Sequence, residues 1–140
     1  VMLKDTKSDF TVAVSLAPDF RAAATYNGTS VYLAGYNSAA VVFSTGDLAS
    51  GTATPSIEES SDGSTNWAAI SADRLNGTLA AVSANSTLVI GLTNVAGITK
   101  KYVRAVIVVA GGSGTLCSAY VIRGEAQHNP AGGSSTILIA

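Results

Sequence analysis

The chain has 140 residues with a formal net charge of −1, and Ala, Ser, Thr and Gly account for 68 of them. This length is enough for one domain that buries its core without disulfides. No basic block is long enough to indicate nucleic-acid binding, and no apolar run approaches the ~18 residues that a membrane span requires. The first residues do not resemble a secretory signal, so we expect a protein made in a cytoplasm.

The first predicted element is an amphipathic strand at residues 10–16. Phe10, Val12 and Val14 alternate there with small or polar residues, and Pro18 predicts the end of the strand. Such a strand can join the domain's own sheet or pair with a neighbouring molecule, and the sequence leaves both possibilities open.

Short apolar segments separated by turn signals continue along the chain. They predict a turn at Asn27-Gly28, strands at residues 31–33 and 39–43, a loop at 46–55, a hairpin of 56–60 with 66–70, a helical turn within 71–77, and strands at 79–82 and 87–92. No long amphipathic helix is predicted, so the pattern indicates an all-β fold.

The most apolar segment is residues 102–110, in which Arg104 is the one charged residue. Its β-branched residues predict a strand that is covered on both faces. Gly111, Gly112 and Gly114 then predict a reversal into a second strand at 115–123. We interpret the pair as a β-hairpin around which the rest of the chain is organised.

About eight short antiparallel strands at this spacing predict a jelly roll or another Greek-key sandwich with extended terminal arms. We assign residues 1–125 to a single β-sandwich domain, with an N-terminal strand or arm at 1–19, and residues 126–140 to a flexible C-terminal tail. The apolar side chains predicted to form the sandwich core are Val41, Ile57, Trp67, Val89, Val103, Val106, Val108 and Val121.

The C-terminal tail combines a linker of Gly and Ser at 132–135 with an apolar tip of Ile137, Leu138 and Ile139. A tip this small cannot form a core, so we expect an attachment arm that adds to the sheet edge of a neighbour. The alternative is that the tail folds back and covers an edge of its own sheet.

Residues that carry chemistry are sparse. His128 is the one histidine and has no neighbouring carboxylate or cysteine to orient it, while Cys117 lies in an apolar stretch that predicts a packed thiol. Glu58, Glu59 and Asp62 lack the alternation of a calcium loop, and successive strand residues face opposite sides. We therefore expect a binding or assembly role, with no catalytic residues, metal, cofactor or small-molecule ligand.

Four segments together resemble small head-associated proteins of tailed bacteriophages. They are residues 22–28 (AAATYNG), 33–39 (LAGYNSA), 58–65 (EESSDGST) and 101–104 (KYVR). From residue 22 to 127 the chain is similar to the jellyroll cement proteins of short-tailed phage heads. The resemblance implies a jelly roll on the capsid exterior of the virion, made in the host bacterial cytoplasm. It also implies a symmetric homodimer that clamps neighbouring major capsid protein subunits together, with no catalytic residues.

Three groups of residues are candidate contacts with the capsid or with a dimer partner. They are the apolar residues of the N-terminal strand, the basic residues of the central strand pair, and the apolar tip: Phe10, Val12 and Val14; Lys100, Lys101, Arg104 and Arg123; Ile137, Leu138 and Ile139. We expect the basic residues to be exposed and to steer the protein onto an acidic capsid surface, so that high salt slows decoration.

A carbohydrate-binding, lectin-like module is the alternative function, since jelly rolls are frequent among lectins. The chain has three Phe, one Trp and five Tyr, and no loop gathers several of them. Trp67 is therefore predicted to be a structural anchor under the sheet rather than a platform for a sugar ring.

Overall fold

The computed structural model describes residues 10–48, 51–93, 95, 99–112 and 114–126. Its strands are Phe10–Arg21 (β1), Ala24–Asn27 (β2), Val31–Tyr32 (β3), Tyr36–Thr45 (β4), Thr52–Ser60 (β5), Ala68–Ala69 (β6), Leu75–Asn76 (β7), Thr87–Leu92 (β8), Tyr102–Ala110 (β9) and Thr115–Ala126 (β10). A turn of 3-10 helix, η1 (Ala72–Arg74), confirms the predicted helical turn. Among the described residues, no helix is long and apolar enough to cross a membrane.

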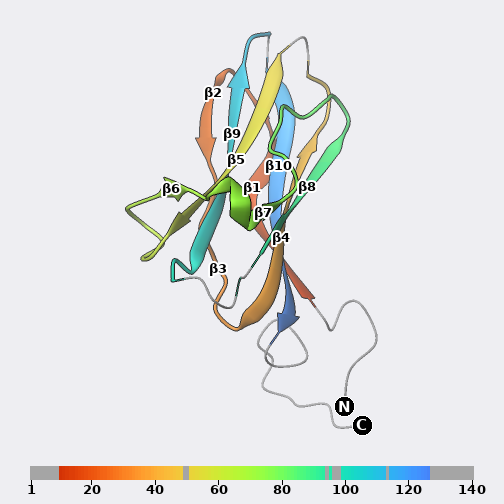
Figure 1. Cartoon of the computed structure of the whole chain (residues 1–140). Helices are drawn as coiled ribbons and strands as arrows, with labels where there is room; N and C mark the ends of the chain where they lie inside the picture. Colours follow the sequence, from red (N-terminus) through yellow and green to blue (C-terminus); the bar gives the residue numbers. More distant parts are fainter. Residues whose placement is uncertain (1–9, 49–50, 94, 96–98, 113, 127–140) are drawn as a thin grey trace.

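The strands form two antiparallel sheets that pack face to face (Figure 1). Sheet A has the order β1-β10-β4-β8-β7, and sheet B has the order β2-β9-β5-β6 with β3 also paired to β9. The predicted hairpin of residues 56–60 with 66–70 is present as β5 and β6. The predicted strand at 79–82 is present only as a single bridge between Ala53 and Val82. The predicted loop at 46–55 is shorter than expected, because β5 begins at Thr52.

The strand order is that of a jelly roll. With the short strands β3 and β7 set aside, the others pair first with last: β1 with β10, β2 with β9, β4 with β8, and β5 with β6. A chain folded into one long antiparallel ribbon makes these four pairings. Rolling the ribbon into two layers adds the pairs of β10 with β4 and β9 with β5. The predicted all-β sandwich is therefore confirmed.

Alternation along each strand decides which side chains fill the space between the sheets. Val41 and Phe43 on β4 are fully buried, and Ile57 and Ile107 approach them from sheet B with 1% of their surface exposed. Phe43 is the largest fully buried side chain, so the core is mainly aliphatic. The residues between these inward-facing positions point away from the core.

Four residues of the predicted core, Val41, Ile57, Val103 and Val121, belong to the cluster between the sheets. Val106 is buried as predicted, with 4% of its surface exposed, although it lies outside the cluster between the sheets. Val108, two residues further along β9, is 39% exposed on the outer face of sheet B. Val89 is 55% exposed on the outer face of sheet A. The prediction was wrong for Val89 and Val108 because both faces of their strands are apolar, so the composition does not tell the inward face from the outward one.

Residues 102–110 and 115–126 do not form a hairpin with each other, and that prediction was wrong. β9 pairs within sheet B, whereas β10 pairs with β1 and β4 in sheet A. Gly111, Gly112 and Gly114 have φ angles of 69°, 61° and 118°, which glycine adopts without strain. Paired strands lie about 5 Å apart and stacked sheets about 10 Å apart, and this glycine-rich segment connects the two layers.

The N-terminal strand belongs to the domain's own sheet. β1 pairs with β10 from Phe10 opposite Gly124 to Arg21 opposite Thr115, with register shifts on either side of Leu16. Pro18 lies in the second irregularity of this edge strand, where no ladder hydrogen bond is required of it. The alternative that residues 10–16 form an external arm is therefore wrong. Residues 1–9 and the tail at 127–140 lie outside the described residues.

Candidate interaction surface

The outer face of sheet A is apolar across four strands. Two rows cross it in register: Val12, Ile122, Ala40 and Gly91 in one, and Val14, Tyr120, Val42 and Val89 in the next. The residues that alternate with them, such as Val41, Ile90 and Val121, are fully buried between the sheets. Phe20 and Leu116 continue the surface as register partners. We call the two rows together with Phe20 and Leu116 the sheet A face.

Most of the exposed large hydrophobic side chains lie on the sheet A face. Among the described residues there are seven such side chains, and five belong to this face: Val12 (53%), Val14 (48%), Phe20 (54%), Val89 (55%) and Leu116 (47%). Isolated exposed hydrophobic residues are ordinary, but a contiguous apolar face marks a place where another macromolecule binds.

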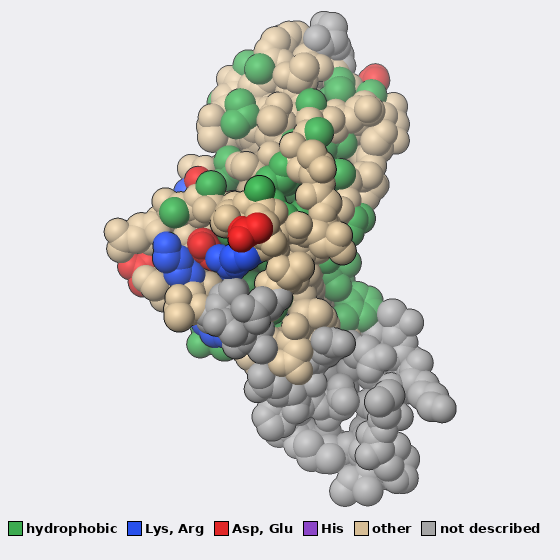
Figure 2. Space-filling view, viewed as in Figure 1, with side chains coloured by type: hydrophobic (Ala, Val, Ile, Leu, Met, Phe, Trp, Pro, Cys, Tyr) green, Lys and Arg blue, Asp and Glu red, His purple; other side chains and the backbone are tan. Residues whose placement is uncertain are grey.

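Charge is distributed away from this face. The residues of the sheet A face are all uncharged. In Figure 2 most of the charged side chains in view gather around β6 of sheet B and η1, the turn that leads from β6 to β7. A partner that buries the sheet A face would therefore need an uncharged surface of its own, since burying an unpaired charge is costly.

A hollow of about 520 Å³ lies at the end of the sheet A face where β1 is irregular. Pro18, Phe20 and Leu116 contribute its apolar walls. Ser44 and Ser118, which are register partners, contribute polar atoms, and Asp19 contributes one carboxylate at its edge. A hollow with apolar walls next to a flat apolar face is the usual form of a pocket for one anchoring side chain of a partner.

The structure brings the predicted N-terminal contact residues onto this surface. Val12 and Val14 belong to the sheet A face, and Phe10 is half-buried at the start of β1. Sequence reasoning missed Val42, Tyr120 and the other residues of β4, β8 and β10 that complete the face. The signal was present, because these strands are apolar at both odd and even positions. The predicted tip of residues 137–139 lies outside the described residues.

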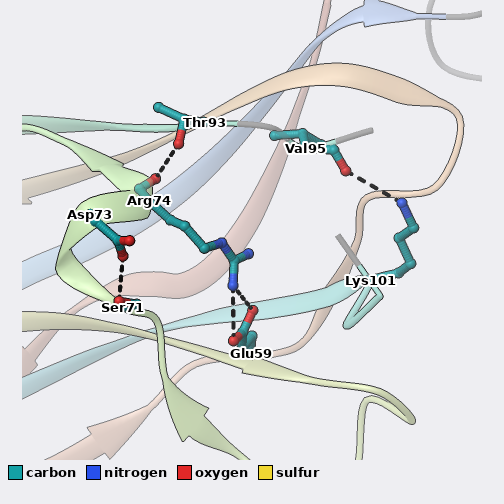
Figure 3. Close-up of polar contacts among 7 residues, drawn as sticks. All are labelled: Glu59, Ser71, Asp73, Arg74, Thr93, Val95 and Lys101. Carbon is teal, nitrogen blue, oxygen red and sulfur yellow. Dashed lines mark hydrogen bonds and ion pairs between the residues drawn. The ribbon is translucent and has the colours of Figure 1, made fainter. Parts of the chain in front are cut away.

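The basic residues predicted to be exposed are all half-buried. Arg104 lies 2.6 Å from the carboxylate of Glu58, and Lys101 donates a 3.3 Å hydrogen bond to the carbonyl of Val95 (Figure 3). Lys100, the neighbour of Lys101, is also half-buried. The expectation of strong electrostatic steering through exposed basic residues therefore has no support in their placement.

Arg123 is half-buried and links the two sheets. Its Nη1 donates a 2.9 Å hydrogen bond to the carbonyl of Tyr32, and its guanidinium lies 4.8 Å from the centre of the Tyr36 ring. Tyr32 belongs to sheet B and Arg123 to sheet A, so this contact ties the sheets together.

A second tie joins Arg74 to Glu59. Arg74 Nη1 lies 2.8 Å and 3.1 Å from the two carboxylate oxygens of Glu59, which is 7% exposed at the end of β5 (Figure 3). The carbonyl of Arg74 accepts hydrogen bonds from the N–H and hydroxyl of Thr93, which follows β8. Residues around Arg74 therefore connect β5 of sheet B with β8 of sheet A.

Aromatic side chains meet on the outer face of sheet B, which sequence reasoning missed. Tyr32 on β3 is opposite Tyr102 on β9, with ring centroids 4.7 Å apart and planes tilted by 33°. Two residues further along β9, the guanidinium of Arg104 lies 4.4 Å from the centre of the Trp67 ring and is bound to Glu58. We call these five residues the sheet B cluster. Trp67 is half-buried here, so its predicted position under the sheet was wrong.

The loop between β5 and β6 supports the sheet B cluster. Asp62 accepts hydrogen bonds from the hydroxyl and N–H of Thr65 and from the N–H of Ser64, and these bonds hold the pKa of its carboxyl well below the ordinary value of 3.8. Gly63, at φ 78°, lies against the ring of Tyr102, where an added Cβ would come within 2.7 Å. The loop therefore fixes one side of the Tyr102 ring.

The described residues offer little for catalysis or metal binding. Glu58 and Glu59 point to opposite faces of β5, and no group of three His, Cys, Asp or Glu in the described ranges could hold a metal ion. Burial raises the pKa of the Cys117 thiol, which is 3% exposed, so it is a packed side chain. His128 lies outside the described residues. No protein-family model and no curated protein sequence matches the chain.

Proposed function

We propose that the chain is a structural protein that decorates the outside of a viral capsid, binds it through the sheet A face, and stabilises contacts between major capsid protein subunits. The observation that carries the proposal is the contiguous apolar surface over β1, β10, β4 and β8. The resemblance of residues 22–127 to jellyroll cement proteins supports the capsid as the partner. The proposed location is the virion exterior, after synthesis in the host bacterial cytoplasm.

The size and chemistry of the sheet A face suit a protein partner. Burying one Val or Leu side chain contributes about 1.5–3 kcal/mol, and five large side chains of the face are about half exposed. Their combined burial can offset the entropy that two proteins lose on association. A carboxylate introduced into the face would be buried without a counter-ion, at a cost on the order of several kcal/mol.

The proposal is tested by adding the purified protein to capsid shells from which it has been stripped. Val89→Glu places a carboxylate on the sheet A face, and Val108→Glu is the matched control on the outer face of sheet B. The unmodified protein and Val108→Glu should bind equally, and Val89→Glu at least about tenfold more weakly. Failure of the unmodified protein to bind at any ionic strength rejects the proposal, as does an equal loss in both variants.

Binding through an uncharged face should depend weakly on salt. Screening acts between charges, and apolar burial is not weakened by it. We therefore expect the Kd for stripped shells to change by less than about threefold between ~0.05 M and ~0.5 M NaCl. A much larger loss at high salt would assign the contact to the basic residues instead of the sheet A face.

A homodimer through self-contact, which the resemblance implies, is tested with the same two variants. Sedimentation equilibrium of the isolated protein measures its mass in solution. If Val89→Glu converts dimers into monomers and Val108→Glu does not, the sheet A face is the dimer surface and the capsid contact lies elsewhere.

A further inference from the structure

We propose that the sheet B cluster is a binding site for a neutral pyranose glycan, which stacks on Tyr32 and hydrogen-bonds to Glu58 and Arg104. The site is independent of the proposed capsid contact, because the outer faces of two packed sheets point in opposite directions. A protein docked through the sheet A face would present the sheet B cluster to the surrounding solvent.

The aromatic part of the site is a rigid, open platform. Tyr32 is 48% exposed, and its ring packs on Tyr102 with a centroid distance of 4.7 Å. Tyr102 is held in turn by Gly63, which lies against its ring. Neither tyrosine hydroxyl has a hydrogen-bond partner among the described residues. An exposed ring with a fixed orientation offers the apolar face and polar tip that suit the C–H face and hydroxyls of a sugar.

The polar part of the site lies beside the tyrosine pair, two residues along β9. Arg104 Nε and Nη2 both bind Oε1 of Glu58, at 2.8 Å and 2.6 Å. Glu58 Oε2 and Arg104 Nη1 are left without a partner among the described residues. Because Nε and Nη2 both face Oε1, Nη1 points away from Glu58, so the free acceptor and the free donor lie on opposite sides of the ion pair. They can bind two hydroxyls at separate positions of a glycan, each of which can donate and accept.

Charge decides which class of ligand the site would bind. The Arg104–Glu58 ion pair is neutral overall, and Trp67 covers the guanidinium at 4.4 Å. A phosphate or another anion would have to displace Glu58 from Arg104, whereas a neutral glycan can use the groups that the ion pair leaves free.

The test uses the fluorescence of Trp67, which is the only tryptophan in the chain and lies inside the cluster. The isolated protein is titrated with cellohexaose, maltoheptaose and chitohexaose. We expect a saturable fluorescence change with at least one of them, with a Kd of about 1 mM or below. Tyr32→Ala should weaken binding at least about tenfold, and Tyr120→Ala, the matched control on the sheet A face, should bind within about twofold of the unmodified protein.

Two results would overturn the proposal. One is the absence of both a fluorescence change and a saturation-transfer NMR signal for all three oligosaccharides at about 10 mM. The other is binding that survives Tyr32→Ala. If Tyr32→Ala does not fold, Tyr32→Leu keeps an apolar contact with Tyr102 but removes the platform, and the same loss is expected. Because the isolated protein is used, the outcome is separate from that of capsid binding.

Discussion

The hydroxyl of Ser15 accepts a 2.9 Å hydrogen bond from the backbone N–H of Ala105, and this bond links sheet A to sheet B. The same hydroxyl donates to the carbonyl of Thr29 at 2.9 Å. Ser15 is 2% exposed, so water cannot replace either bond. Gly28 fits beside it because it has no side chain, since an added Cβ would lie 2.4 Å from the hydroxyl oxygen. The hydroxyl of Ser15 therefore joins the edge strand β1 of sheet A to β9 of sheet B.

Ser15→Ala should lower the free energy of unfolding by about 1–3 kcal/mol, because the buried N–H of Ala105 loses its acceptor. Urea denaturation measures the change. The control is Ser44→Ala on the outer side of β4, where the hydroxyl has no hydrogen-bond partner among the described residues and a change below about 0.5 kcal/mol is expected. Equal stabilities of the two variants would contradict a role for Ser15 in joining the sheets.

Adjacent residues of β9 should differ strongly in their response to truncation. Ile107 is 1% exposed in the core, and Ile107→Ala should cost about 2–5 kcal/mol through lost burial and the cavity left behind. Val108 is 39% exposed on the opposite face, and Val108→Ala should cost less than about 1 kcal/mol. Thermal and urea unfolding of both variants measure this difference. A larger cost at Val108 would mean that β9 faces the other way.

The strands of the fold were predictable because their apolar residues alternate with turn signals between them. The run at 102–110 predicted a strand, and β9 has those bounds. Its partners were not predictable, because pairing depends on which sheet each strand enters and a glycine-rich segment can connect strands within a sheet or between sheets. This is why the segment at 111–114, predicted to be the turn of a hairpin, in fact connects the two sheets.

The candidate surfaces were predictable only in part. Val12 and Val14 were identified because alternation within one strand is visible in the sequence. The tyrosine pair was not, because Tyr32 and Tyr102 are distant in the chain and meet through the pairing of β3 with β9. Arg104 was taken for an exposed steering residue, since its ion pair with Glu58 depends on the register between β9 and β5.

The ion pair of Arg74 with Glu59 should contribute to holding the two sheets together. Arg74→Ala would leave the Glu59 carboxylate, whose side chain is 10% exposed, without its partner at a cost of roughly 2–3 kcal/mol. A double-mutant cycle with Glu59→Gln and Arg74→Met separates the pair energy from the lost packing, and we expect a coupling of about 1 kcal/mol or more. Additive costs in this cycle would show that the pair has no net effect on stability.

Asp62 should make the loop between β5 and β6 sensitive to acid. Its hydrogen bonds to Thr65, Ser64 and Ser60 lower the pKa of the folded state below the ordinary value of 3.8. The lowered pKa stabilises the folded state fully above that ordinary value, and the stabilisation is lost as the pH falls toward the folded-state pKa. NMR titration of the Asp62 side chain should therefore give a midpoint below 3.8. A midpoint at the ordinary value would contradict the hydrogen-bonded loop.

The same titration should reach the sheet B cluster, because Gly63 of this loop packs against Tyr102. When Asp62 is protonated, one carboxyl oxygen becomes a donor and the other accepts more weakly, so the hydrogen bonds that fix the loop weaken and the ring signals of Tyr102 and Tyr32 should shift together with the carboxyl. Asp62→Asn should remove the shift, since an amide does not titrate, while the unmodified protein keeps it. Ring signals that respond equally to acid in the two proteins would show that the loop does not support the tyrosine pair.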